Sequence, residues 1–123
     1  MERTTLSHQL LAHAGSPAVS FVPGEVIFRE GDKGDKMYLI RSGEVEIELD
    51  GKVIETLAQG DIFGEMALID RSPRVASARA KTHCELAAIT EKSFLFLVDE
   101  MPYFAIFVMR TLADRLRRMD KRL

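Results

Sequence analysis

The sequence predicts a mainly β domain, an antiparallel sandwich or rolled barrel with one short helix before it and two helices after it. Two observations lead to this prediction. Short apolar and β-branched runs recur about every 8–12 residues, with glycine-containing turns between them. The last third of the chain then changes to the apolar spacing of helices. A parallel βαβ sheet would need long helical crossovers between its strands, and the middle of the chain has none.

Composition narrows the class of protein. The 123 residues suffice for one domain with a single core, and 46% of apolar residues is too many for a disordered chain. A net charge of −2 provides no general attraction for nucleic acid. The lone Cys84 excludes an internal disulfide and fits a reducing compartment. With no secretion signal and no apolar run of bilayer length, we expect a cytoplasmic protein.

The first elements follow from the change in apolar period. Residues 4–14 have the pattern of a short helix with its leucines on one face, and Gly15-Ser16-Pro17 stops it. From Val19 onward the period is that of strands, and Pro23-Gly24 makes the first turn. The strands are expected at residues 25–28, 37–40, 44–49, 52–57, 76–81 and 85–89.

The clearest strand signal is the run from Glu44 to Leu49. Glutamates alternate there with hydrophobic residues, so one face of the predicted sheet is apolar and the other is charged. Asp50 and Gly51 tolerate the positive φ angles of a two-residue primed turn. Lys52–Leu57 is therefore expected to return as the antiparallel partner of the first strand.

Two helices are predicted at the C-terminal end. Thr90 can cap a helix over Glu91–Glu100, and Pro102 ends it. A second helix runs from Phe104 to the C-terminus and carries an apolar seam whose residues are alternately four and three apart. This seam either packs on the domain's own barrel or forms a homodimer through a parallel helix pair over residues 104–123. The seam residues are Ala105, Met109, Leu112, Leu116, Met119 and Leu123.

The stretch from Phe63 to Ala80, FGEMALIDRSPRVASARA, interrupts the strands with many small residues. The turn predicted after Gly64 presents unpaired backbone amides, which suit an anion. Arg74 adds a charged, planar fork of donors that matches phosphate oxygens. Glu65 is unfavourable beside an anion unless it accepts a hydrogen bond from a sugar hydroxyl. One arginine and a few amides suit a singly charged phosphodiester better than a triphosphate.

Two other interpretations of this stretch are weaker. A P-loop triphosphate site is excluded, because the chain has no GxxxxGK[ST] loop and no carboxylate cluster for Mg²⁺. Glu65 and Arg74 could also form a plain surface ion pair on a turn. The small residues around them argue against that, because small side chains let backbone amides approach a ligand closely.

Residues 63–80 resemble the phosphate-binding cassette of the cyclic nucleotide-binding domain, the module of protein kinase A regulatory subunits, cyclic-nucleotide-gated channels and catabolite-activator-type bacterial regulators. The resemblance runs from Val22 to the C-terminal helices and includes Gly31-Asp32, Gly43 and Gly60-Asp61. It implies an antiparallel β-roll (double-stranded β-helix, or jelly roll) of about eight strands. The expected layout is one domain over 1–123, with an N-terminal helical segment at 1–18, the roll at 19–89 containing the cassette at 63–77, and hinge and lid helices at 90–123.

The resemblance also implies roles for residues at matching positions. Glu65 would accept from the ribose 2′-hydroxyl, Arg74 would pair with the cyclic phosphate, and Leu68 would couple the cassette to the following helix. Family members that have lost cyclic nucleotide binding commonly lack this Glu or Arg, and this chain has both. Five backbone amides of the cassette would complete the phosphate site, those of Gly64, Met66, Ala67, Val75 and Ala76. The implied ligand-binding residues are Phe63, Gly64, Glu65, Met66, Ala67, Arg74, Val75, Ala76 and Ser77.

The implied ligand is a 3′,5′-cyclic purine nucleotide that acts as a signal, and no other cofactor is expected. Relatives that favour cGMP often carry Thr after the cassette arginine. Val75 offers no hydrogen-bonding side chain there, so cAMP is expected ahead of cGMP. The last helix is expected to cover the base, by apolar contact through Leu112, Leu116 or Met119, or by stacking of Arg115 or Arg118.

An enzyme is the first rival interpretation. Cupin-type jelly rolls hold a metal through clustered histidines, whereas His8, His13 and His83 are scattered along this chain. Cys84 is interpreted as a small core residue. We therefore expect no catalytic residue and no metal.

A nucleic-acid-binding regulator is the second rival. Six basic residues make the last helix positive, but they fit a solvated face near a helix C-terminus. In bacterial regulators a helix-turn-helix follows this helix, and this sequence ends there, so we expect no direct contact with nucleic acid. The alternative function is a fragment or truncated relative of a cAMP-responsive transcription regulator or gated channel, and the effector protein is unknown. The basic residues are Arg110, Arg115, Arg117, Arg118, Lys121 and Arg122.

Overall fold

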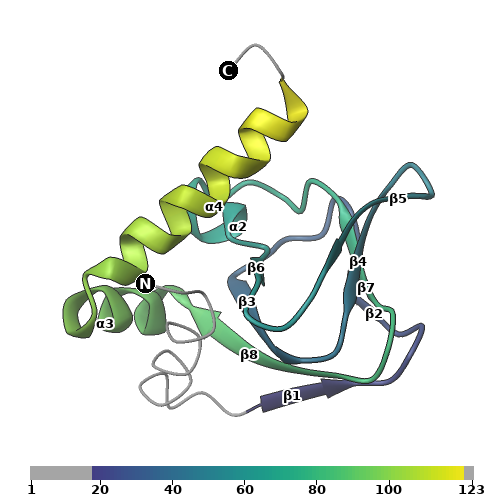
Figure 1. Cartoon of the computed structure of the whole chain (residues 1–123), viewed down its shortest axis with the longest axis horizontal. Coiled ribbons are helices and arrows are strands. Elements are labelled where there is room, and N and C mark those ends of the chain that lie inside the picture. Colours follow the sequence, from purple (N-terminus) through teal and green to yellow (C-terminus); the bar gives the residue numbers. More distant parts are fainter. Residues whose placement is uncertain (1–17, 121–123) are drawn as a thin grey trace.

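Two four-stranded antiparallel sheets share one core and form a roll (Figure 1). The computed structural model describes residues 18–120. The strand orders are β1-β8-β3-β6 and β2-β7-β4-β5, so each sheet combines strands that are far apart in the sequence. The prediction of a roll of eight antiparallel strands is confirmed for this part of the chain. The strands are β1 (Ala18–Phe21), β2 (Val26–Phe28), β3 (Lys36–Ser42), β4 (Val45–Leu49), β5 (Lys52–Leu57), β6 (Ile62–Phe63), β7 (Ser77–Ala80) and β8 (Cys84–Thr90).

Strands β1 and β6 are the two that the sequence did not predict. β1 has four residues and pairs with β8, and β6 has two residues and pairs with β3. They are strands because a longer neighbour, β8 or β3, provides the hydrogen-bonding partners. The short β6 leads directly into the segment predicted to be the phosphate-binding cassette, residues 63–77.

The predicted hairpin of β4 and β5 is confirmed. The two strands pair antiparallel from Val45 opposite Leu57 to Leu49 opposite Lys52. Asp50 and Gly51 have φ angles of 53° and 76°, as a primed two-residue turn requires. A register shift after Ile47 lets the outer part of the hairpin twist away from the sheet.

Three helices lie in the described part of the chain: α2 (Met66–Ile69), α3 (Glu91–Glu100) and α4 (Tyr103–Met119). Thr90 caps α3 as predicted, because its hydroxyl accepts from the Ser93 amide at 3.2 Å. α4 begins one residue before the predicted start, with Pro102 as its N-cap residue. The helix predicted over residues 4–14 lies outside the described residues.

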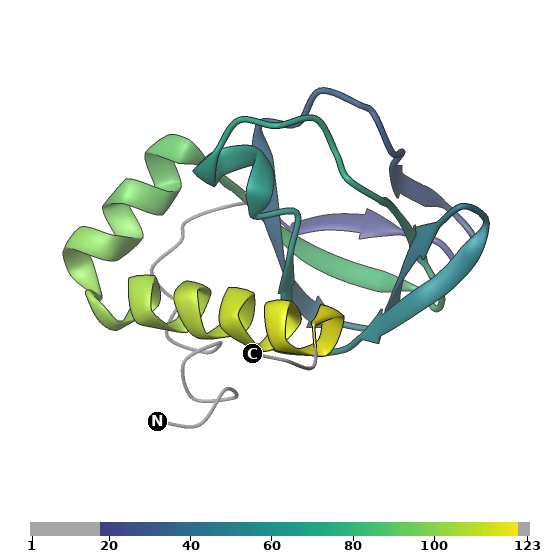
Figure 2. The same ribbon diagram turned by 90° about the horizontal axis from the view of Figure 1, so that it is seen from above.

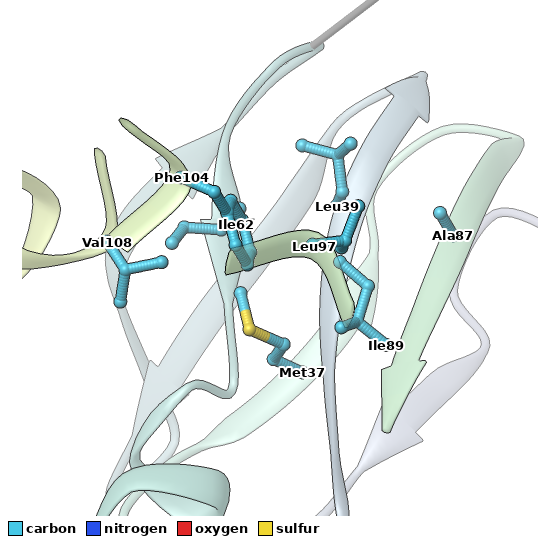
Figure 3. Close-up of a cluster of buried hydrophobic side chains, with 8 residues drawn as sticks. All are labelled: Met37, Leu39, Ile62, Ala87, Ile89, Leu97, Phe104 and Val108. Atoms are coloured by element: carbon cyan, nitrogen blue, oxygen red, sulfur yellow. The ribbon is translucent and has the colours of Figure 1, made fainter. Parts of the chain in front are cut away.

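Strand β3 separates two cores, because its alternate side chains point to opposite sides of the sheet. Met37 and Leu39 face the helices and contribute to a helix-side core, which Figure 3 shows. Ile40 faces the interior of the roll and contributes to an inner core. The helix-side core is Met37, Leu39, Ile62, Ala87, Ile89, Leu97, Phe104 and Val108; the inner core is Ile40, Val45, Leu57, Phe63, Ala78, Ala80, Cys84 and Leu86.

Helix α4 has two apolar faces, and only one of them packs on the domain. Figure 2 shows α3 and α4 meeting at an angle beside the roll. Phe104 and Val108 are buried in the helix-side core. Met109, Leu116 and Met119 of the predicted seam are instead 55%, 55% and 84% exposed. These three seam residues therefore do not pack on the domain's own barrel. Among residues 18–120, no helix combines the length and apolar character needed to cross a membrane.

Candidate functional site

The cassette lies in the connection between β6 and β7, next to β3 (Figure 1). Gly64 has a φ of 76°, which turns the chain sharply out of β6. The amides of Leu68 and Ile69 donate to the Glu65 carbonyl at 3.0 and 3.1 Å, which closes the single turn of α2. The amides of Met66 and Ala67 come before this first bonded turn, so the turn itself offers them no acceptor.

Arg74 is buried and is held in a defined orientation. Its side chain is only 7% exposed. Nη1 donates to the Gly64 carbonyl at 2.8 Å, and Nη2 donates to the Lys36 carbonyl at 2.7 Å. The guanidinium carbon also lies 4.0 Å from the centre of the Phe28 ring, within the range of a cation–π contact. Two carbonyls and one aromatic face therefore fix the plane of the guanidinium.

One hydrogen-bond donor of the Arg74 guanidinium, Nε–H, is unpaired within residues 18–120. Nε is buried and has no hydrogen-bond partner among the described residues. Burial lowers the pKa of Arg74, while Tyr38, Asp35, Asp32 and Glu65 raise it. Arginine remains charged in proteins even so. A buried, charged group with an unpaired donor is costly unless an acceptor meets it, so the position suits an anionic ligand.

Glu65 is the second buried charge of the cassette, at 3% exposed, and its partner comes from α4. Nη1 of Arg115 donates to the Glu65 carboxylate. Nη2 of the same arginine donates to the Ile62 carbonyl at 2.5 Å, just before the cassette begins. α4 is therefore attached to the cassette through the carboxylate that the sequence assigns to a ribose hydroxyl.

Glu55 on β5 extends this ion pair into a network. Its carboxylate lies 3.6 Å from Nε of Arg115 and accepts from Nη1 of Arg118 at 2.5 Å. Glu55 and Arg115 have side chains that are 21% and 20% exposed, so water screens this pair less than a surface pair. The network joins the C-terminal half of α4 to both the cassette and the outer hairpin.

The predicted lid residues have different positions in the structure. Leu112 packs against the helix-side core, while Leu116 and Met119 are exposed. Arg115 pairs with Glu65 and Arg118 pairs with Glu55, so both are engaged with carboxylates. The structure thus brings Arg115 to the site by pairing it with Glu65, the residue predicted to contact the ribose. That one of these side chains covers the base remains a prediction.

The other predicted cassette residues fall into buried and exposed groups. Ala67 and Ala76 are buried, whereas Val75 is 63% exposed, next to Arg74. The hydroxyl of Ser77 accepts from the Glu30 amide at 2.9 Å, which ties the end of the cassette to the loop before β3. Leu68 packs against the helix-side core, where α3 and α4 contribute Leu97, Phe104 and Val108.

Four residues at the site were not predicted from the sequence. Phe28 and Lys36 contact Arg74 through a ring face and a carbonyl, Glu55 pairs with Arg115, and Gly34 lies against the Arg74 side chain. A ring face and a backbone carbonyl have no sequence motif. Gly34 could have been found from the sequence. Gly31 already serves the turn of this loop, so a second glycine suggests that another group comes close to the backbone there. The described residues contain no group of three or more His, Cys, Asp or Glu side chains arranged to hold a metal ion.

Comparison with known proteins gives the class of this domain. The family model described as "Cyclic nucleotide-binding domain" matches residues 18–101. The crystal structure of the Thermus thermophilus catabolite activator protein superposes with a TM-score of 0.79 at 32% identity, covering 98% of this chain and 56% of that one. The cAMP-bound form of the EAL enzyme Bd1971 gives a TM-score of 0.62 at 39% identity over 83% of this chain and 29% of that one.

Sequence relatives agree with this class. The human potassium/sodium hyperpolarization-activated cyclic nucleotide-gated channel 4 is 38% identical over 83% of this chain and 8% of its own length. The cAMP-dependent protein kinase regulatory subunit of Emericella nidulans is 44% identical over 62% of this chain and 19% of its own length. This chain belongs to the cyclic nucleotide-binding domain family. It spans only a small part of the length of either relative.

Proposed function

We propose that this domain binds cAMP as a regulatory signal, with Arg74 on the cyclic phosphate and Glu65 on the ribose 2′-hydroxyl. The observation that carries the proposal is that these two opposite charges are both buried in the connection between β6 and β7, and that Nε of Arg74 has no hydrogen-bond partner among the described residues. A cyclic nucleotide has one negative charge beside one hydroxyl on a rigid ring, which matches this pair of groups. Amides of Gly64, Met66, Ala67, Val75 and Ala76 would complete the phosphate contacts.

The base preference follows from Val75. Its side chain is exposed beside Arg74 and cannot hydrogen-bond the guanine amino group. Without that contact, guanine gains nothing to offset the desolvation of its extra polar groups. We therefore propose cAMP as the preferred ligand and cGMP as a weaker one. Both nucleotides occur among the neighbours, since Bd1971 has been solved in a cAMP-bound and in a cGMP-bound form.

Binding would be passed on through Leu68 and α4. Leu68 packs on the helix-side core, so a shift of α2 changes the surface on which α3 and α4 rest. Arg115 connects α4 to Glu65, the group that would also receive the ribose. The ligand favours a new helix position only by binding more tightly to it. We propose that a second copy of the chain or an effector protein in the cytoplasm reads this change.

Calorimetric titration of the purified protein with cAMP and with cGMP tests this function. We expect saturable binding of both nucleotides, at one site per chain, with at least a threefold lower Kd for cAMP. Equal affinities would overturn the base preference alone. No binding of either nucleotide at millimolar concentration would overturn the proposed function.

Changing Glu65 to Gln tests the ribose contact. The amide is a weaker acceptor than the carboxylate, so cAMP affinity should fall about tenfold, while affinity for 2′-deoxy-cAMP should change far less. The measurement is the ratio of the two Kd values in the wild type and in Glu65→Gln. Glu46→Gln, on β4 away from the cassette, is the control and should keep the wild-type ratio. An unchanged ratio in Glu65→Gln would show that Glu65 does not contact the 2′-hydroxyl.

We also propose that two copies pair along the exposed seam of α4. Met109, Leu116 and Met119 form an apolar stripe on the side of the helix that does not pack on the roll. Light scattering after size exclusion should give about twice the 13.8 kDa of one chain. Met109→Glu should return the protein to a monomer, whereas Arg110→Glu, the neighbouring exposed position outside the seam, should not. A monomeric wild type at 100 µM would contradict the pairing.

A further inference from the structure

The loop between β2 and β3, residues 29–35, is hydrogen-bonded to the backbone of Arg74. The Gly31 amide donates to the Arg74 carbonyl at 2.8 Å, and the Arg74 amide donates to the Asp32 carbonyl at 2.8 Å. The loop is itself closed by the Arg29 amide, which donates to the Asp32 carboxylate at 3.0 Å. The backbone of Arg74 is thus held by a second segment of the chain, about 40 residues away along the sequence.

The same loop also contacts the Arg74 side chain, at Gly34. A Cβ atom at Gly34 would lie 2.4 Å from Nε of Arg74, 2.6 Å from its Cζ and 2.9 Å from Cβ of Ala67. Contacts below 3.0 Å are essentially never seen for a real Cβ atom, so any side chain here would force a neighbour to move. The guanidinium therefore occupies the space that a side chain at position 34 would need.

Gly34 differs from the loop glycines that serve the backbone. Gly24, Gly31 and Gly51 all have positive φ angles, and no atom beyond the adjoining residues lies within 4 Å of the position that a Cβ would take, so they are glycines for conformational reasons. Gly34 does not have a positive φ angle. Its backbone conformation is open to other residues, and the reason for glycine there is the close approach of Arg74.

We propose that Gly34 is a positioning residue for the Arg74 guanidinium. Phe28 covers one face of the planar group, and the carbonyls of Lys36 and Gly64 hold its two terminal nitrogens. Gly34 leaves the room at Nε and Cζ that this orientation requires. A methyl group at position 34 would push the guanidinium off the Phe28 ring and away from the two carbonyls. The consequence for ligand binding rests on the proposed function, in which Arg74 meets the phosphate.

The first test is the Nε–H signal of Arg74 in a ¹H–¹⁵N NMR spectrum of the free protein. The Phe28 ring current should displace this signal in the wild type, and Gly34→Ala should return it toward the position of an exposed arginine. Gly34→Ala should also weaken cAMP binding at least tenfold. Gly51→Ala, in the β4–β5 turn, is the control, because it strains the backbone without a neighbour to displace and should change neither readout. An unmoved Arg74 signal in Gly34→Ala would overturn the inference.

The second test is a double-mutant cycle on Tm that needs no ligand. Gly34→Ala should lower Tm by about 5–10 °C in the wild type, as expected for overpacking. In an Arg74→Ala background the fall should be at least halved, with the contact to Ala67 accounting for the rest. An equal fall in both backgrounds would overturn the inference. If Gly34→Ala alone does not fold, recovery of folding in the double variant supports the inference, and failure of both overturns it.

These readouts separate the two proposals. If the wild type binds neither cAMP nor cGMP, the proposed function fails, while the NMR signal and the Tm cycle still decide whether Gly34 positions Arg74. If the wild type binds cAMP and Gly34→Ala binds equally well with an unmoved Arg74 signal, the proposed function stands and the positioning role fails.

Discussion

Arg74→Ala is expected to weaken cAMP binding by at least two orders of magnitude. The reason is that hydrogen bonds to a charged partner each contribute about 1.5–3 kcal/mol, and the variant loses all those that the guanidinium makes to the phosphate. The Phe28 ring and the Lys36 and Gly64 carbonyls already hold the guanidinium in place, so the wild type loses little entropy in ordering it. The measurement is the Kd from calorimetric titration.

Two variants control this experiment. Arg79→Ala removes an arginine from the neighbouring strand β7, where it donates to the Gly24 carbonyl at 2.8 Å and pairs with Glu48 at 3.2 Å. It should cost some stability and leave the Kd within about twofold. Arg74→Lys keeps the charge and loses the planar fork, so it should fall between wild type and Arg74→Ala. If Arg74→Ala binds as tightly as Arg79→Ala, the phosphate lies elsewhere.

Arg115→Ala is expected to destabilise the domain by about 3 kcal/mol, because it leaves the buried Glu65 carboxylate without its partner. It also removes the bond to the Ile62 carbonyl and the pair with Glu55. Denaturant titration gives this change as a lower midpoint at an unchanged slope. Because α4 is held to the cassette by this side chain, the amides of its C-terminal half should also exchange hydrogen faster.

Arg117→Ala is the matched control on the same helix. Arg117 is two residues away, its side chain is 63% exposed, and it pairs only with Asp114, at 3.4 Å, among the contacts found in the described part of the chain. An exposed pair of this kind is worth less than about 0.5 kcal/mol. Equal destabilisation by the two variants would mean that the Arg115–Glu65 pair contributes nothing beyond helix propensity.

The parts of the fold that could be predicted are those whose structure depends on residues close together in the sequence. The alternation of β4, the Asp50-Gly51 turn and the Thr90 cap each depend on neighbouring residues, and each appears where the sequence predicts it. β1 and β6 were not predicted as strands, and each is held by hydrogen bonds to a longer neighbour, β8 or β3. The same dependence on distant segments explains why the exposed side of α4 was not distinguishable from its packed side.

The sequence by itself determined the class of domain, the β4–β5 hairpin, the helix that Thr90 caps, and the presence of one glutamate and one arginine in a cassette of small residues. These depend on residue type and short spacing, which the chain carries directly. Only the tertiary structure decided that Arg115 meets Glu65 from 50 residues away, that Lys36 accepts from Arg74 across 38 residues, and that Gly34 makes room for the guanidinium. Such contacts exist because folding brings distant segments to one place, and their energies depend on burial that no local pattern encodes.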